Sequence, residues 1–370
     1  MEFTIDRNEL MTALYLTQGI VDRRTTIPIL GNVLIQSVDD GVCVTATDQE
    51  VAVERRCTAA VKRKGSLTTP ARKLYEMVRE FPEGEVRFHS LENNWIEVAC
   101  GRSRFRLVGM DPREFPAVPQ PVEGSAAESL RVPASALADM IERTVFAVSG
   151  DETRVNLHGI YLEGVDGERL RLVATDGHRL AMITRPVEGT APAKGVILSR
   201  KAVQELRKAL EEDGEPVEFS VRGGMAHATR GPVRMSMRLV EGEFPDYHQV
   251  IPAKSERTAS IEVGAFLAAL RRVSLVSSER THGVKLQFET NRLELSSINP
   301  DIGEAAEEAE CQFEGDMLSI GFNARYLIEA LSLFPPDGRL DIGLNDDVSP
   351  GVVRLSSDPD YCYIVMPMRL

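Results

Sequence analysis

The amino-acid sequence contains the same segment three times, at shifts of about 127 to 130 residues. Residues 3–10 (Phe-Thr-Ile-Asp-Arg-Asn-Glu-Leu) return in altered form at residues 130–137 and again at residues 260–267. Each copy predicts a short alternating strand that enters a helix. The chain is therefore expected to fold as consecutive copies of one structural unit.

Each of these segments is followed by paired strands and then by a second helix. The strand pairs are expected at residues 33–38 with 42–47, 159–162 with 170–175, and 284–288 with 293–297. The second helices carry one apolar stripe each: Leu74, Met77, Val78 and Phe81; Val203, Leu206 and Leu210; Leu327, Ala330, Leu331 and Phe334. Proline and small residues gather at 119–127 and 251–255, which is typical of linkers. The pattern predicts an α+β fold of three repeated domains, residues 1–124, 125–252 and 253–370, each with two helices against antiparallel sheet.

Composition excludes several classes of protein. Five scattered cysteines without a C-x-x-C pair argue against a disulfide framework or a zinc site and predict reduced, mostly buried thiols. There is no apolar run of roughly 18 residues and no basic-then-apolar N-terminus, so a soluble protein that is not exported is expected. The acidic run at residues 304–310 is expected to be a solvated loop or strand end.

No signature of catalysis or of nucleotide binding is found in the sequence. The best enzymatic candidate is Asp176-Gly177-His178-Arg179, because an Asp near a His can orient a general base, as in a hydrolase. The equivalent Asp48-Gln49-Glu50 keeps the acid without the His, and no nucleophile or oxyanion donor accompanies the motif. We expect a protein that is not an enzyme, with no catalytic residues, no metal and no cofactor.

Basic residues recur at one position of the repeat. Arg72, Lys201 and Arg325 each lie two residues before the apolar stripe of a second helix. They could be ordinary salt-bridged surface residues, or they could form a positive stripe that faces a phosphate backbone. A net charge of −13 argues against nucleic acid unless the basic residues share one surface. No aromatic ladder interleaves them, so a duplex fits better than a single strand.

Four motifs carry a resemblance that covers the whole chain. They are Ile27-Pro28-Ile29-Leu30-Gly31-Asn32, Ala174 to Ala181, Phe244-Pro245-Asp246-Tyr247 and the terminal Met366-Pro367-Met368-Arg369-Leu370. With them the chain resembles the bacterial DNA polymerase sliding clamps, the beta subunits of DNA polymerase III. The resemblance implies the DNA-clamp fold and a head-to-tail homodimer whose six domains form a ring around double-stranded DNA.

The same resemblance implies function and partners. The ring would tether the replicative DNA polymerase to its template and so confer processivity, after a separate ATP-driven clamp loader has opened it. The clamp loader, other polymerases and repair proteins would bind through short linear motifs. The protein would work in the bacterial cytoplasm, with the nucleoid and not with a membrane. An alternative that stays open is a peptide-binding scaffold that does not encircle DNA.

Simple geometry favours two chains in such a ring over one. A domain of about 120 residues has a radius of gyration near 14 Å and a diameter of roughly 35 Å. Three touching spheres of that size leave a hole of about 5 Å, whereas six leave about 35 Å. Only the larger hole admits a duplex about 20 Å wide.

The resemblance also assigns residues to three surfaces. The partner-peptide groove would be formed by Leu157, Thr175, Gly177, His178, Arg179, Leu180, Pro245, Val250, Ile364, Met366, Pro367, Met368 and Arg369. The DNA contacts would be Arg24, Arg72, Lys73, Arg154, Arg200 and Lys201, and the dimer interface would use Phe105 and Leu107 against Leu275 and Val276. The chain departs from the family at Arg154-Val155-Asn156, where many members have tyrosines, and at Ser349-Pro350-Gly351, where others are richer in serine.

Overall fold

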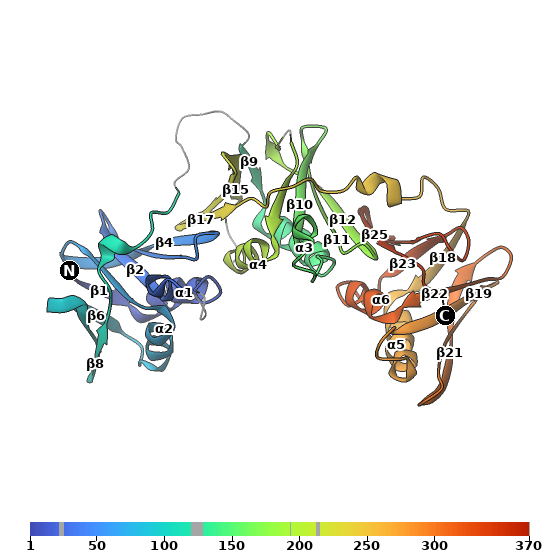
Figure 1. Ribbon diagram of the computed structural model, residues 1–370, viewed down its shortest axis with the longest axis horizontal. Helices are drawn as coiled ribbons and strands as arrows, with labels where there is room; N and C mark the ends of the chain where they lie inside the picture. Colours follow the sequence, from blue (N-terminus) through green and yellow to red (C-terminus); the bar gives the residue numbers. More distant parts are fainter. Residues whose placement is uncertain (22–25, 120–128, 193, 212–214, 370) are drawn as a thin grey trace. The chain divides into compact units, whose positions relative to one another are not determined.

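The computed structural model describes residues 1–21, 26–119, 129–192, 194–211 and 215–369. Contacts group them into two compact units, and each unit is described here by itself (Figure 1). Unit 1 comprises Met1–Ala138, Val187–Ala193 and Lys201–Leu239, and unit 2 comprises Asp139–Pro186, Lys194–Arg200 and Val240–Leu370. These units group residues by contact, whereas the boundaries 1–124, 125–252 and 253–370 divide the chain by repeat and stay a prediction.

Unit 1 is built on one continuous antiparallel sheet. Its strands are β1 (Glu2–Asp6), β2 (Asn32–Val38), β3 (Gly41–Thr47), β4 (Val51–Arg63), β5 (Ser66–Pro70), β6 (Glu85–Ser90), β7 (Trp95–Cys100), β8 (Ser103–Val108), β9 (Ser129–Val132), β13 (Glu188–Gly189), β15 (Val217–Arg222), β16 (Met225–Arg230) and β17 (Val233–Arg238). The main path runs β13-β9-β15-β16-β17-β4-β1-β6-β7-β8, and a branch leads from β4 through β3 and β2 to β5.

Unit 2 has the same construction. Its strands are β10 (Gly159–Val165), β11 (Arg169–Thr175), β12 (Arg179–Pro186), β14 (Val196–Ser199), β18 (Arg257–Glu262), β19 (Gly283–Glu289), β20 (Arg292–Asn299), β21 (Gly303–Phe313), β22 (Leu318–Asn323), β23 (Arg339–Leu344), β24 (Gly351–Leu355) and β25 (Asp358–Val365). Their order is β14-β10-β11-β12-β25-β24-β23-β18-β21-β20-β19-β22. The acidic run expected in a loop or strand end lies inside β21, because its side chains alternate between a half-buried and an exposed face.

The helices lie where the sequence repeat places them. They are α1 (Arg7–Thr17), α2 (Ala71–Glu80), α3 (Ala134–Val145), α4 (Arg200–Ala209), α5 (Val263–Val273) and α6 (Ala324–Leu331). Asp6 begins α1 by accepting hydrogen bonds from the backbone N–H groups of Asn8 and Glu9 at 2.8 and 3.2 Å, which is the usual N-cap arrangement. Asn323 caps α6 in the same way, at 2.9 Å from the Arg325 nitrogen.

Each helix turns its apolar stripe toward a core. α1 packs on α2 in unit 1, and α5 packs on α6 in unit 2 (Figure 1). Fully buried members of the stripes are Leu10, Leu14, Leu74, Val78, Phe266, Leu270, Leu327 and Leu331. The expected mixture of paired helices and antiparallel sheet is confirmed, and so are the mostly buried thiols, since Cys43 alone is only half-buried. Within the described ranges, no helix is long and apolar enough to cross a membrane.

In each unit, one antiparallel strand pair joins two sequence repeats, and the two pairs are formed by equivalent strands. In unit 1 the beginning of β4 pairs with β17, and in unit 2 the beginning of β12 pairs with β25. The third equivalent pair is not made: β8 pairs only with β7 in the described sheet, and the first part of β21 pairs only with β20. Among the described residues, β8 and the first part of β21 therefore each have one unpaired edge.

Candidate functional site

The turn between β11 and β12 is the centre of the surface expected to bind peptides. Asp176 accepts hydrogen bonds from the backbone nitrogens of His178 and Arg179 at 2.9 and 3.0 Å. The Thr175 hydroxyl donates to the Arg179 carbonyl at 2.7 Å and accepts from the Gly177 nitrogen at 3.1 Å. Gly177 has φ of +90°, a conformation that favours glycine. The motif therefore forms a turn that leaves Gly177 and His178 exposed.

An apolar cluster lies beneath this turn. Its buried members are Val173, Leu180, Tyr247, Val352, Cys362 and Ile364, with Tyr161, Met182, Phe244 and Ile251 packed against them. The rings of Tyr161 and Phe244 stack with centroids 4.8 Å apart. Tyr247 donates its hydroxyl to Glu163, and burial together with this hydrogen bond raises the pKa of Tyr247 to about 12. The Phe244-Pro245-Asp246-Tyr247 motif thus fixes one side of the cluster through its aromatic rings.

The C-terminal segment continues the surface. The Met366 nitrogen donates to the His178 carbonyl at 2.9 Å, and the Met368 nitrogen donates to the Gly321 carbonyl at 2.9 Å. The Met366 side chain is 37% exposed beside the turn. These two backbone bonds hold the terminal residues against β12 and β22.

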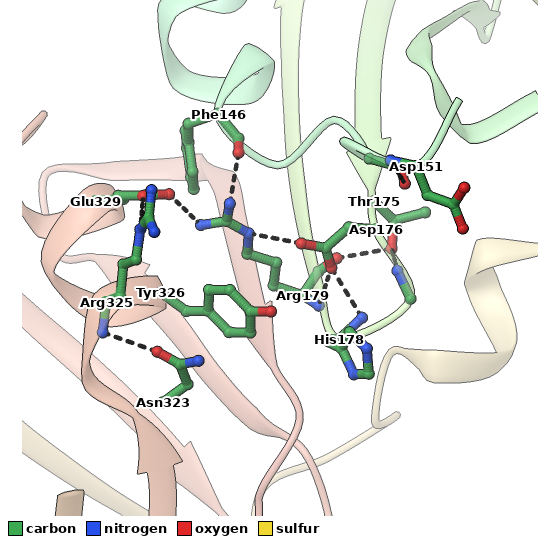
Figure 2. Close-up of polar contacts among 12 residues, drawn as sticks. Phe146, Asp151, Thr175, Asp176, His178, Arg179, Asn323, Arg325, Tyr326 and Glu329 are labelled. Carbon is green, nitrogen blue, oxygen red and sulfur yellow. Dashed lines mark hydrogen bonds and ion pairs between the residues drawn. The ribbon is translucent and has the colours of Figure 1, made fainter. Parts of the chain in front are cut away.

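Arg179 is the most highly connected residue of this surface (Figure 2). The side chain is only 8% exposed, and its three nitrogens point to three different partners. Nε donates to Asp176 at 3.0 Å, Nη1 to Glu329 on α6 at 2.6 Å, and Nη2 to the Phe146 carbonyl at 2.7 Å. The guanidinium carbon also lies 4.4 Å from the centre of the Tyr326 ring. Arg179 thereby connects the β11–β12 turn to α6.

Glu329 completes this network. It accepts hydrogen bonds from Arg179 and, at 2.9 Å, from Arg325 one turn earlier on α6. Burial opposes ionisation of the carboxyl, but the hydrogen bonds from the two arginines outweigh it and lower the pKa of Glu329. Figure 2 shows the His178 ring on the same side of the turn as Tyr326, and the two ring centres are 6.5 Å apart.

The expected groove residues are all in unit 2, and they differ in exposure. Exposed residues are Gly177, His178, Pro245, Val250, Met366 and Arg369; half-buried ones are Leu157, Pro367 and Met368; buried ones are Thr175, Arg179, Leu180 and Ile364. Arg154, expected on DNA, also lies here: its guanidinium is 3.3 Å from Asp151 and 3.4 Å from the Asp176 carbonyl. The assignment of these residues to a groove and to DNA stays a prediction.

The geometry does not assemble a general base from Asp176 and His178. The Asp176 carboxylate accepts from two backbone nitrogens and from the Arg179 side chain, which leaves its role structural. The equivalent Asp48 behaves alike and accepts from the nitrogens of Glu50 and Val51 at 2.9 and 2.7 Å. The hydrolase interpretation therefore has no support in the arrangement of these side chains.

The basic residues expected on DNA are partly engaged by carboxylates. Arg72 and Lys73 lie in the first turn of α2, largely exposed, and both bind Glu76 at 2.8 Å. Lys201 at the start of α4 binds Asp48 at 2.5 Å and the Ile20 carbonyl at 3.2 Å. Arg200 is half-buried at the first position of α4, and Arg24 lies outside the described residues.

None of the four residues expected at the dimer interface is buried. Phe105 is 42% exposed, with its ring 5.6 Å from that of Phe81, and Leu275 is 79% exposed. Leu107 and Val276 are half-buried. These exposures do not fit four residues of an internal core.

Several residues of these surfaces were not identified from the sequence. Phe146, Tyr326 and Glu329 surround Arg179 but are distant from it along the chain, so no local pattern could have joined them. Ile302, in the turn before β21, and Ile298, near the end of β20, are 62% and 75% exposed. For these two isoleucines the sequence offered one signal, which is the position of Ile302 just before the acidic run at residues 304–310.

Comparison with known proteins identifies one family along the whole chain. Family models of the DNA polymerase III beta subunit match at residues 1–119 (N-terminal domain), 131–246 (central domain) and 248–369 (C-terminal domain). The beta sliding clamp of Caulobacter vibrioides is 35% identical over 377 residues, with both chains covered completely.

Solved structures agree with this result. A DnaN sliding clamp from Pseudomonas aeruginosa, solved bound to griselimycin, superposes with a TM-score of 0.94 at 34% identity, and both chains are covered completely. The C. crescentus beta sliding clamp, solved with polyethylene glycol at a putative beta-motif tethering region, gives 0.92 at 35% identity over the full length of both chains. The chain belongs to the DNA polymerase III beta subunit family, the bacterial sliding clamps, and has the DNA-clamp fold.

Proposed function

We propose that two copies of this chain close head to tail into a ring around duplex DNA and there tether DNA polymerase III to its template. The observation that carries the proposal is the pair of unpaired strand edges, β8 at the end of unit 1 and β21 in unit 2. The equivalent strands pair with each other at both internal ladders, β4 with β17 and β12 with β25. Pairing β8 of one copy with β21 of the other gives both of these edges a partner.

Charge supports the pairing of these two edges. β8 carries Arg104 and Arg106, whose side chains are 67% and 63% exposed. The acidic run of β21 includes Glu304 and Glu308, both exposed. A positive strand and a negative strand attract each other and discourage pairing of like with like. Exposed Phe105 and Leu275 add apolar area, and the interface residues Phe105, Leu107, Leu275 and Val276 belong to this proposal.

The proposed DNA contacts of the ring are weak, because carboxylates already bind some of the basic residues. The proposal assigns them to Arg24, Arg72, Lys73, Arg154, Arg200 and Lys201. Glu76 binds both Arg72 and Lys73, so their attraction for phosphate is reduced. A ring is held by topology, so weak salt-sensitive attraction suffices and lets it slide. The net charge of −13 keeps the remaining surface unattractive to DNA.

Partner proteins would dock on the surface around the β11–β12 turn. Exposed His178, Val250 and Met366 lie within two residues of members of the apolar cluster or of residues packed against it, and a methionine adapts its shape to different peptides. Short linear motifs of the polymerase, the clamp loader and repair proteins are the proposed ligands. The residues are the thirteen assigned to the groove above, with Arg154 and Tyr326 added because they border the same turn.

The protein's role is to raise the effective concentration of the polymerase at the primer end, without catalysis of its own. A separate ATP-driven loader opens the ring. The three clamp domains of the proposal are residues 1–124, 125–252 and 253–370, and three separate family models, at residues 1–119, 131–246 and 248–369, support a division into three. The site of action is the bacterial cytoplasm, where the nucleoid lies. A peptide-binding scaffold that never encircles DNA is not favoured, because it leaves both strand edges unexplained.

Retention on circular DNA tests the ring. The protein is loaded on nicked circles with a cognate loader and ATP, and gel filtration in high salt follows, before and after the circle is linearised. High salt removes phosphate attraction, so retention then reports topology. We expect the protein to stay on circles and to run off linear molecules. Loss from both, while a known clamp loads in parallel, would contradict encirclement.

A further inference from the structure

We propose that an ionic cluster of four side chains, outside the docking surface, holds that surface in the shape that binds partner proteins. The ionic cluster consists of Asp139 and Arg143 on α3, Arg185 near the end of β12 and Asp358 at the beginning of β25. The inference rests on the proposed docking around the β11–β12 turn and adds a set of positioning residues to it.

Each arginine of the ionic cluster binds both aspartates. Arg143 Nε lies 2.6 Å from Asp139, and Arg143 Nη1 donates to Asp358 at 3.1 Å. Arg185 Nη2 donates to Asp139 at 3.1 Å and to Asp358 at 2.6 Å, and its Nη1 donates to Asp358 at 3.1 Å. All four carboxylate oxygens are thereby paired, and the cluster has no net charge. Such a network holds its members in one geometry, because displacing one of them leaves opposite charges unpaired.

The ionic cluster is shielded from solvent and packs against aromatic rings. The side chains of Arg143, Arg185 and Asp358 are 17%, 19% and 15% exposed. The Arg143 guanidinium carbon lies 5.9 and 5.8 Å from the centres of the Phe334 and Tyr361 rings. The Tyr361 hydroxyl donates to the Arg143 carbonyl at 3.3 Å. Phe334 follows α6 and Tyr361 belongs to β25, so Arg143 connects α3 of the second sequence repeat with two elements of the third.

The ionic cluster and the docking surface lie toward opposite ends of one strand pair. β12 pairs with β25 from Arg179, opposite Val365, to Ile183, opposite Tyr361. Arg185 follows two residues after Ile183, so it lies about 20 Å along the strand from Arg179, at roughly 3.3 Å per residue. The cluster is therefore separate from the residues assigned to partner docking.

The docking surface is made from both sides of this strand pair. His178 and the motif at residues 244–247 belong to the second repeat, whereas Met366 and Tyr326 belong to the third. Neighbouring strands differ in twist by about 10 to 35°, so a ladder by itself leaves the angle between two repeats adjustable. The Arg179 network fixes one end of the strand pair, and the ionic cluster fixes the other. A surface already held in its binding shape binds more tightly, because less free energy is lost in ordering it.

The junction of the first two repeats, in unit 1, is built differently. By the sequence repeat, Thr12 and Leu16 on α1 take the places of the two cluster members on α3. By the register of the ladders, Cys57 takes the place of Arg185. None of the three is charged, since burial raises the pKa of the Cys57 thiol to about 12. A cavity of about 270 Å³ lies beside Thr12 and Leu16. No docking is proposed at this junction, so the ionic cluster accompanies the docking surface.

Surface plasmon resonance with the immobilised polymerase subunit of DNA polymerase III tests the positioning role. Arg185→Met removes the side chain that binds both aspartates and should raise the dissociation constant at least about fivefold. Asp139→Asn is the milder variant and should raise it less, because Asp358 still binds both arginines. Arg169→Met is the matched control: Arg169 pairs with Asp360 of β25 at the surface, with 37% of its side chain exposed, and its loss should leave the constant nearly unchanged.

Two measurements separate positioning from a general loss of stability. Leu286→Ala removes a fully buried side chain from β19, away from the β12–β25 pair, and should destabilise unit 2 in urea without weakening polymerase binding. Hydrogen exchange of the Met366 amide, which donates to the His178 carbonyl, should be faster in Arg185→Met than in Leu286→Ala. Equal weakening of binding by Leu286→Ala would overturn the positioning role.

The outcomes also distinguish this inference from the proposed function. If a variant that lacks residues 366–370 binds the polymerase subunit as the wild type does, the docking surface is wrong and the inference falls with it. If that deletion abolishes binding while Arg185→Met and Asp139→Asn bind like the wild type, the positioning role alone is overturned. Circular dichroism of each variant checks that the substitutions leave the fold intact.

Discussion

Replacing Arg179 by methionine should strongly destabilise unit 2. The change keeps the length of the side chain but removes three hydrogen bonds at 2.6 to 3.0 Å from a residue that is 8% exposed. Asp176 and Glu329 would keep their charges with fewer partners, and the Phe146 carbonyl would lose its side-chain donor. A buried ion pair that loses one member costs about 3 to 5 kcal/mol.

The expected loss lies at the low end of that range. Asp176 still accepts from two backbone nitrogens, and Glu329 still accepts from Arg325 at 2.9 Å. We therefore expect about 3 kcal/mol for Arg179→Met. Arg179→Lys should cost about 2 kcal/mol, because one ammonium cannot reach three partners in different directions.

Urea unfolding followed by circular dichroism measures this loss. With a slope of about 2.5 kcal/mol per molar, 3 kcal/mol moves the midpoint of the affected transition by roughly 1 M. The emission of Trp95, which lies in unit 1, gives an internal control at the same protein concentration. Arg280→Met, at an exposed arginine of unit 2, is the matched variant. A midpoint for Arg179→Met equal to that of Arg280→Met would refute the reasoning.

Four further predictions concern the pH dependence of unit 2 and the three proposed surfaces. Because the pKa of Glu329 is lowered from its usual 4.5, its ionised form contributes stability above that pH and loses it as the pH falls through the lowered value. The stability difference between wild type and Glu329→Gln in urea unfolding should thus be complete at pH 7 and shrink below 4.5; a constant difference would contradict the network. Leu275→Asp/Val276→Asp should give folded monomers by sedimentation, and an unchanged dimer mass would exclude these residues from the interface. Deleting residues 366–370 should abolish binding of a partner peptide, measured by fluorescence anisotropy, with the ring intact, and retained affinity would remove this segment from the docking surface. Arg72→Glu/Lys73→Glu should reduce the salt dependence of DNA binding by about two phosphate contacts, and an unaltered slope would place the DNA path elsewhere.

Local features of the structure could be predicted because they depend on neighbours in the sequence. Strands β2 and β3, expected at 33–38 and 42–47, were found within a residue at each end, since their alternation and the turn at Gly41 leave little choice. The Asp176-Gly177 turn likewise depends on near neighbours, because Asp accepts from nearby nitrogens and Gly tolerates a positive φ.

Other features depended on partners that no local pattern identifies. The acidic run was expected in a loop or strand end but lies in β21. Its side chains there alternate between an exposed face and a half-buried face, and the strand contacts α5. Arg154 lies 3.4 Å from the Asp176 carbonyl, because the segment before β10 returns to the turn after β11, and its assignment to DNA stays a prediction. Such positions depend on chain reversals, which a single sequence does not specify.

The sequence by itself determined the threefold repeat, which emerges when the chain is compared with itself, and the amphipathic helices, which follow from residues a few positions apart. Only the tertiary structure decided the partners of Arg179, which lie 33 and 150 residues away at Phe146 and Glu329. It also decided which strand edges stay open, since an edge is open only when no other segment of the fold covers it. Periodicity records which face of an element is buried, whereas folding alone determines which distant segment buries it.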